Sequence, residues 1–181
     1  MVLWTLGGQV DRVEADLRAV IQLAREAGHP TLERTAAHNL AEQRLWQGAF
    51  DEAANLARRA LSLQRGHGEG PTWLDELLLA RILAARGDLA ETRALLAAIP
   101  GDIGEDNRVI AGALACCTAP GDDAAAAWSG WLARADAALS EDLRLELGAL
   151  AHRDHLLPPD KLAALRALAT RHPVWSRRHV F

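Results

Sequence analysis

A short glycine-containing phrase recurs along this chain of 181 residues, and it constrains the fold more than any other feature. The phrase begins at Gly8, Gly48 and Gly87 and, with a weaker match, at Gly121. The glycines are 40, 39 and 34 residues apart, and repeats of this period are typical of stacked helical arrays. Because one repeat cannot bury its apolar face alone, the phrase predicts a solenoid in which neighbouring units cover one another.

The apolar residues between these glycines recur with the period of an α-helix. After Gly8, for example, Val10, Val13 and Leu17 mark one helical face. No useful length of the chain alternates with the period of two that indicates a strand. We therefore expect a single all-α domain of about nine helices in antiparallel pairs. The expected repeat units cover residues 1–28, 31–65, 72–100 and 105–139, followed by a degenerate capping pair at 141–172.

Composition excludes two classes of partner. The formal net charge is −4 with acids and bases mixed, so we expect no direct contact with nucleic acid. No apolar run approaches the roughly 18 residues that span a bilayer, so we expect no membrane association. Residues 1–7 lack the basic region and cleavage site of a signal peptide, which predicts a cytoplasmic protein.

No pattern in the sequence supports catalysis. The glycine-rich stretch at residues 66–71 lacks the lysine of a phosphate-binding loop and follows no strand. His152, Asp154 and His155 include ligand types for zinc, but they lie at an expected helix end, where polar residues cap and solvate a turn. We therefore expect a non-enzymatic protein without a cofactor or metal.

The segment from residue 35 to residue 63 resembles a tetratricopeptide repeat. The residues that carry this resemblance are the pair Leu40–Ala41, the turn glycine Gly48, the aromatic Phe50 and the small residues Ala53 and Ala60. The resemblance weakens along the chain, and in the last unit His155 stands where the turn glycine would fall. It implies a right-handed α-solenoid, the superhelix of this family, with a degraded final pair as a cap.

In tetratricopeptide arrays the first helices of successive units line a concave groove that binds peptides or helices. The resemblance therefore implies a non-catalytic protein-interaction module with a peptide or protein partner. The implied groove residues are Thr35, His38, Asn39, Glu42, Leu45, Trp46, Leu74, Leu77, Leu78, Arg81 and Arg108. An alternative stays open, in which these residues pack against another part of the same protein, such as its own C-terminal helix.

The repeat spacing also suggests a second kind of function. Spacings near 40 residues exceed the roughly 34 residues of the usual repeat and resemble the variant repeats of large bacterial regulatory proteins. The alternative function is therefore a regulatory or sensor segment of a larger bacterial transcription regulator or signalling protein, with another domain of that protein as its partner.

The repeat at Gly8 lies so close to Met1 that we interpret the chain as an excised segment. Its apolar start, marked by Leu3, Trp4 and Leu6, is the expected surface for self-association into a homo-oligomer.

Overall fold

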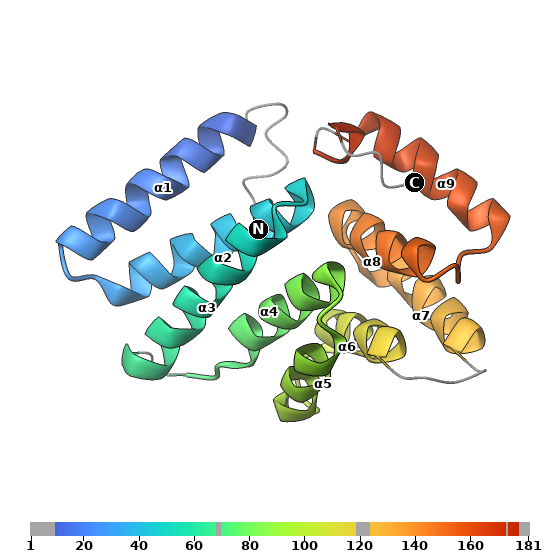
Figure 1. The fold of residues 1–181 in the computed structure, drawn as a ribbon, viewed down its shortest axis with the longest axis horizontal. Helices are drawn as coiled ribbons and strands as arrows, with labels where there is room; N and C mark the ends of the chain where they lie inside the picture. Colours follow the sequence, from blue (N-terminus) through green and yellow to red (C-terminus); the bar gives the residue numbers. More distant parts are fainter. Residues whose placement is uncertain (1–9, 68–69, 119–123, 173, 178–181) are drawn as a thin grey trace.

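A computed structural model describes residues 10–67, 70–118, 124–172 and 174–177 of the chain. Within these ranges every regular element is helical and no strand occurs, which confirms the prediction of an all-α fold (Figure 1). The described elements are α1 (Val10–Glu26), α2 (Pro30–Gln47), α3 (Phe50–His67), α4 (Trp73–Arg86), α5 (Leu89–Ala98), α6 (Glu105–Thr118), α7 (Ala124–Ala138), α8 (Glu141–Arg153), α9 (Pro159–Arg171) and the short 3-10 helix η1 (Trp175–Arg177).

Two of the repeated glycines end helices. Gly48 follows α2 with φ 81°, and Gly87 follows α4 with φ 98°, both in the left-handed region that favours glycine. Their backbone N–H groups donate to carbonyl groups in the last turn, at 3.0 Å from Gly48 to Leu45 and at 2.9 Å from Gly87 to Leu83. At these two positions the repeated phrase therefore marks the end of one helix and the beginning of the next. Gly8 and Gly121 lie outside the described residues.

The helices follow one another along an open arc. In Figure 1 they run from α1 at the left, through α5 at the bottom, to α9 at the right. Each helix packs against the next, and α2, α4, α6 and α8 also contact one another in sequence. The predicted unit 31–65 coincides with α2 and α3 to within two residues at each end, and each later predicted unit contains two consecutive helices.

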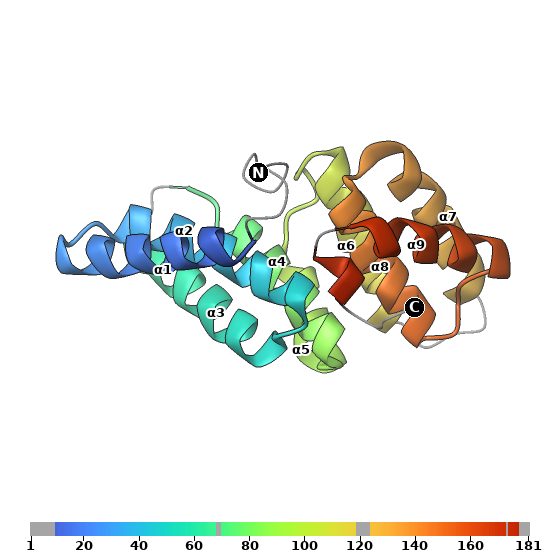
Figure 2. The same ribbon diagram turned by 90° about the horizontal axis from the view of Figure 1, so that it is seen from above.

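The helix α4 lies at the centre of the molecule (Figure 2). All its residues from 75 to 84 are buried, so it has no solvent-facing side over that length. It contributes Leu78 and Ile82 to a hydrophobic cluster shared with α2, α3, α8 and α9, and Leu77 to a second cluster shared with α6, α7 and α8. The charged residues Asp75, Glu76 and Arg81 of α4 are therefore held inside the protein.

Three tryptophans anchor these clusters. Trp46, Trp128 and Trp175 are each 2% exposed or less. Trp46 and Trp175 belong to the cluster around Leu78, whereas Trp128 belongs to the cluster around Leu77.

Among the described helices, none is both long and apolar enough to cross a bilayer.

Candidate functional site

A groove opens beside α2 and α4, and we call it the α2–α4 groove. Its cavity has a volume of about 320 Å³. It is lined by Val13 and Leu17 of α1, Arg34, Thr35, His38, Asn39 and Glu42 of α2, Leu74, Leu77, Leu78 and Arg81 of α4, Asn107 and Ile110 of α6, and Leu143 of α8. Eight of these were predicted from the sequence as groove residues: Thr35, His38, Asn39, Glu42, Leu74, Leu77, Leu78 and Arg81.

Helical spacing explains why these side chains meet. The α2 residues at 35, 38, 39 and 42 follow the helical pattern i, i+3, i+4 and i+7, and so do the α4 residues at 74, 77, 78 and 81. Residues at this spacing share one helical face, so each helix presents a stripe. Since α2 and α4 contact each other directly, the two stripes form adjoining walls.

A buried carboxylate joins the two walls. Asp75 of α4 is 1% exposed and lies 3.0 Å from Nη1 of Arg34 and 2.7 Å from Nδ1 of His38, both on α2. Burial alone would raise the pKa of Asp75, but hydrogen bonds and charge from His38 and Arg34 hold it below its ordinary value. The carboxylate is therefore ionised at neutral pH and fixes the relative position of α2 and α4.

A second charged cluster forms the end of the groove. The guanidinium of Arg81 donates from Nη1 to Glu42 of α2 at 2.7 Å, and from Nε and Nη2 to Glu146 of α8 at 2.9 and 2.7 Å. The indole N–H of Trp46 donates to the same Glu146 carboxylate at 2.8 Å. Burial alone would lower the pKa of Arg81, yet the charges of Glu146 and Glu42 raise it above its ordinary value. The cluster ties α2, α4 and α8 together.

Three predicted groove residues do not line the groove. Leu45 and Trp46 are 1% and 2% exposed because both belong to the hydrophobic cluster that α3, α4, α8 and α9 share with α2. Arg108 lies on an exposed part of α6 and pairs with Glu105 at 2.8 Å. Part of the expected surface is thus buried in the core of the same chain. The C-terminal helix α9 contributes no residue to the groove.

Leu45 and Glu146 both line a second cavity. This cavity has a volume of about 320 Å³ and includes Phe50, Glu146 and Trp175. Arg81 lines the α2–α4 groove and Glu146 lines the second cavity, so their ion pair connects the linings of the two spaces.

Sequence reasoning missed one wall of the groove. Val13 and Leu17 of α1 lie on the apolar stripe that marked a helical face, but that stripe alone does not say which part stays accessible. Arg34 lies next to the predicted Thr35, and its side chain lines the groove while it pairs with Asp75. Leu143 comes from the expected capping pair, and nothing local in the sequence places it here.

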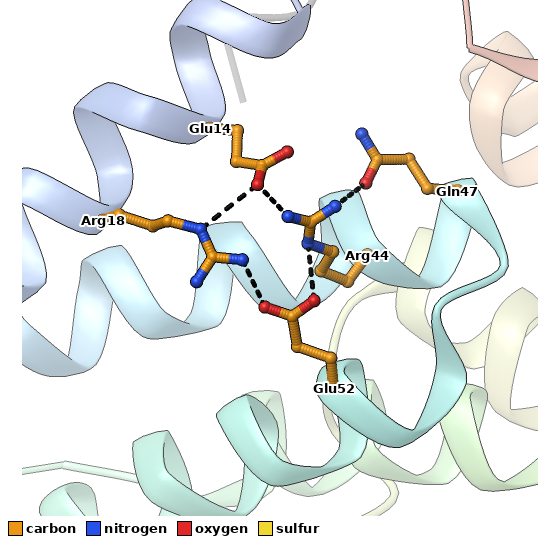
Figure 3. A network of polar contacts seen from close by, with 5 residues as sticks. All are labelled: Glu14, Arg18, Arg44, Gln47 and Glu52. Atoms are coloured by element: carbon orange, nitrogen blue, oxygen red, sulfur yellow. Dashed lines mark hydrogen bonds and ion pairs between the residues drawn. The ribbon is translucent and has the colours of Figure 1, made fainter.

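The α1 wall is held by ion pairs to α2 and α3 (Figure 3). Arg44 of α2 contacts Glu14 of α1 and lies 3.0 Å from Glu52 of α3, while its Nη1 donates to Gln47 at 2.6 Å. Arg18 of α1 pairs with the same Glu14 and Glu52 carboxylates. These contacts bridge three helices at one end of α1.

A second bridge acts at the other end of α1. Glu33 of α2 is 3% exposed and accepts hydrogen bonds from Arg25 of α1 and Arg59 of α3, each with a shortest distance of 3.0 Å. Hydrogen bonds from Arg59 and Arg25 outweigh the effect of burial and lower the pKa of Glu33. Together the two bridges fix α1, and with it the Val13 and Leu17 wall.

The remaining sequence candidates are placed as follows. The expected self-association residues Leu3, Trp4 and Leu6 lie outside the described residues. Within the described ranges, no group of three or more His, Cys, Asp or Glu side chains is arranged to hold a metal ion. Asp154 instead pairs with Arg153 at 2.7 Å, and His155 is a turn residue with φ 58°.

Comparison with known protein families, curated proteins and solved structures finds no match to this chain.

Proposed function

We propose that this protein is a non-catalytic interaction module that binds an amphipathic helix or peptide in the α2–α4 groove. We further propose that its helices form a right-handed α-solenoid of antiparallel pairs, similar to tetratricopeptide arrays. Two features support this architecture. Consecutive helices pack against each other, and α2, α4, α6 and α8 also contact one another in order, as the first helices of stacked units would.

The observation that carries the proposed function is the exposure of Leu74 at the groove. Leu74 is 42% exposed, although it stands beside Leu77 and Leu78, which are 2% and 1% exposed. A large apolar side chain at the mouth of an apolar groove offers a contact that a partner's apolar face would bury. Thr35 and Asn39 provide polar groups at the same groove, as expected for a site that orients a peptide.

Selection from a phage-displayed peptide library, followed by affinity measurement with synthetic peptides, tests this proposal. Leu74→Glu should weaken binding about tenfold or more, because losing one buried leucine contact costs about 1.5–3 kcal/mol. The matched control is Leu23→Glu on α1, where the leucine is 64% exposed and lies outside the groove. Leu77 and Trp46 are unsuitable positions because both are buried in the fold. Failure to select any binder, or equal losses in the two variants, would contradict the proposal.

A second proposal is a sensor or regulatory segment of a larger bacterial transcription regulator or signalling protein. The second cavity favours it, because a ligand there would contact Glu146, which pairs with Arg81 of the α2–α4 groove. Aromatic side chains of Phe50 and Trp175 line this cavity, so indole is a suitable probe. Indole should raise the melting temperature, and Ala149→Phe, which fills the cavity, should abolish the rise. The control Ala94→Phe changes an exposed residue of α5 outside the cavity.

A further inference from the structure

A separate groove lies between α7 and α9, and we call it the α7–α9 groove. Its cavity has a volume of about 330 Å³, within the range that holds small organic ligands. It is lined by Leu132, Ala135 and Asp136 of α7, Arg144 of α8, Leu157 of the following turn, and Lys161, Ala164, Leu165, Leu168 and Arg171 of α9. It shares no residue with the α2–α4 groove or with the second cavity.

The floor of this groove is apolar because α7 and α9 both pack against α8. Leu132, Leu165 and Leu168 are 8%, 7% and 5% exposed, so only their edges reach the cavity. The approach of α9 to α8 is close at Gly148, where a Cβ atom would lie 2.5 Å from Cδ1 of Leu165. Glycine at this point lets α9 sit deep on α8 and sets the depth of the floor.

The charged groups around the floor are mostly basic. Arg144, Lys161 and Arg171 supply three cations, whereas Asp136 supplies the single carboxylate, which gives the lining a net charge of +2. This sign is opposite to the formal net charge of the whole chain, −4. The groove is therefore a local positive region on an acidic protein, and it favours anions.

The cations are not equivalent. Asp136 pairs with Lys161 and lies 3.0 Å from Nη2 of Arg144, and together these two cations lower its pKa against the opposing effect of burial. Arg171 forms no ion pair with any residue in the described part of the chain. Among the described ion pairs, Arg171 is the lining cation that no carboxylate neutralises, and we assign its charge to the ligand.

The groove-lining side chains of α9 follow one another along one face of the helix. Residues 161, 164, 165, 168 and 171 follow the helical pattern i, i+3, i+4, i+7 and i+10, which places them on one face of α9. At about 1.5 Å per residue, Lys161 and Arg171 are about 15 Å apart along the helix axis. Leu165, Leu168 and Ala164 lie between them, so an apolar path leads away from Arg171.

We propose that the α7–α9 groove binds an amphiphilic organic anion, a carboxylate on an unbranched hydrocarbon chain. The carboxylate pairs with the guanidinium of Arg171, which suits it because arginine presents paired donors to carboxylates. The hydrocarbon chain lies over Leu168 and Leu165 toward Leu157, and its burial supplies the apolar part of the binding free energy. The site is independent of the peptide site proposed above.

Calorimetric titration of the full chain with decanoate tests this assignment. Arg171→Glu should weaken decanoate binding about tenfold or more, since it replaces attraction by repulsion at the carboxylate. Arg166→Glu is the matched control, because Arg166 is an exposed arginine of the same helix that does not line the groove. It makes the same change in net charge and should alter binding by less than about twofold. Equal weakening by both variants would assign the effect to net charge and overturn the site.

A second pair of variants tests the path of the hydrocarbon chain. Ala164→Phe fills the groove without changing any charge and should abolish decanoate binding, whereas Ala163→Phe changes an exposed α9 residue outside the groove and should have no effect. Decanol and decyltrimethylammonium should bind at least about tenfold more weakly than decanoate, because neither pairs with arginine. No heat from decanoate, equal binding of the three amphiphiles, or binding that survives Ala164→Phe would each overturn the proposal. None of these results bears on peptide binding at Leu74.

Discussion

The carboxylate of Glu146 on α8 receives two hydrogen bonds from the guanidinium of Arg81 on α4, and both side chains are more than nine-tenths buried. The two residues are 65 positions apart in the sequence. Their pairing therefore joins the last third of the chain to the central helix. It also closes one end of the α2–α4 groove, so the fold and the proposed binding surface depend on the same contact.

Glu146→Gln should lower the free energy of unfolding by about 3 kcal/mol, because a buried arginine loses the carboxylate that balances most of its charge. The substitution preserves the shape of the side chain, so the loss reports on charge rather than on packing. Urea unfolding followed by circular dichroism measures it. The control is Glu91→Gln, since Glu91 pairs with Arg58 on the surface, with the side chains 48% and 41% exposed, and should cost less than about 1 kcal/mol. A loss no larger than the control's would mean that Glu42 alone suffices to balance Arg81.

Acid should destabilise the protein partly through Asp75. Its pKa in the folded protein lies below the ordinary value of 3.8, because His38 and Arg34 favour the ionised form more than burial disfavours it. The unfolded chain binds the proton at higher pH than the folded chain does, so the contribution of Asp75 is present above 3.8 and is lost as the pH falls through the folded pKa. Stability against urea, measured at a series of acidic pH values, should therefore decline across this window.

The variant Asp75→Asn separates this contribution from other carboxylates. It should be less stable than the wild type at neutral pH and should show a flatter dependence of stability on pH in the acid range. Asp51→Asn is the control, because the Asp51 side chain is 91% exposed, and its profile should follow that of the wild type. If Asp75→Asn retains the full slope, the acid sensitivity arises elsewhere, with Glu33 as the next buried carboxylate to test.

Local sequence pattern was sufficient for much of the groove. The helical period places Thr35, His38 and Asn39 on one face of α2, and the same period selects Leu74 and Leu77 on α4. Glycine identified the helix ends at Gly48 and Gly87 because its conformational freedom is a property of the residue itself. Such features depend on residues within a few positions of one another.

Long-range packing set the features that the sequence did not reveal. Nothing near Glu146 distinguishes it from an exposed glutamate, yet it is buried and accepts a hydrogen bond from the indole N–H of Trp46 on α2. Asp75 and Arg81 are charged residues of the kind found on a solvated helix face, but every residue of α4 from 75 to 84 is buried. Burial of a charged residue requires a partner from another helix, and the sequence does not state which helices meet.

The turn after α8 should be strained at His155. Its φ of 58° lies in the left-handed region, where a residue with a Cβ atom is disfavoured by roughly 1–2 kcal/mol relative to glycine. His155→Gly should therefore raise the free energy of unfolding by about 1 kcal/mol and the melting temperature by about 3 °C. Differential scanning calorimetry measures both.

Gly87→Ala, which places a Cβ atom at a left-handed position, is the matched control for the backbone strain at His155. Gly87 has φ 98°, and a Cβ atom there would meet no other atom within 4 Å, so Gly87→Ala changes only the backbone preference. It should lower stability by about 1 kcal/mol. An unchanged melting temperature in His155→Gly, together with a loss in Gly87→Ala, would mean that the His155 side chain makes compensating contacts in the turn.

The contact between α6 and α7 should require glycine at position 112. A Cβ atom on Gly112 would lie 2.1 Å from Cζ2 of Trp131, too close for any real contact, so Gly112→Ala must displace the indole ring. That ring also lies beneath the guanidinium of Arg134, at 4.5 Å from its centroid, so the displacement disturbs a second interaction. Overpacking of this kind costs about 1–3 kcal/mol.

Gly130→Ala on α7 is the control, because a Cβ atom there meets nothing within 4 Å and alanine favours the helix by up to about 1 kcal/mol. The two alanine variants should therefore shift the urea midpoint in opposite directions, and a stabilising shift in both would show that α6 and α7 are further apart than this contact requires.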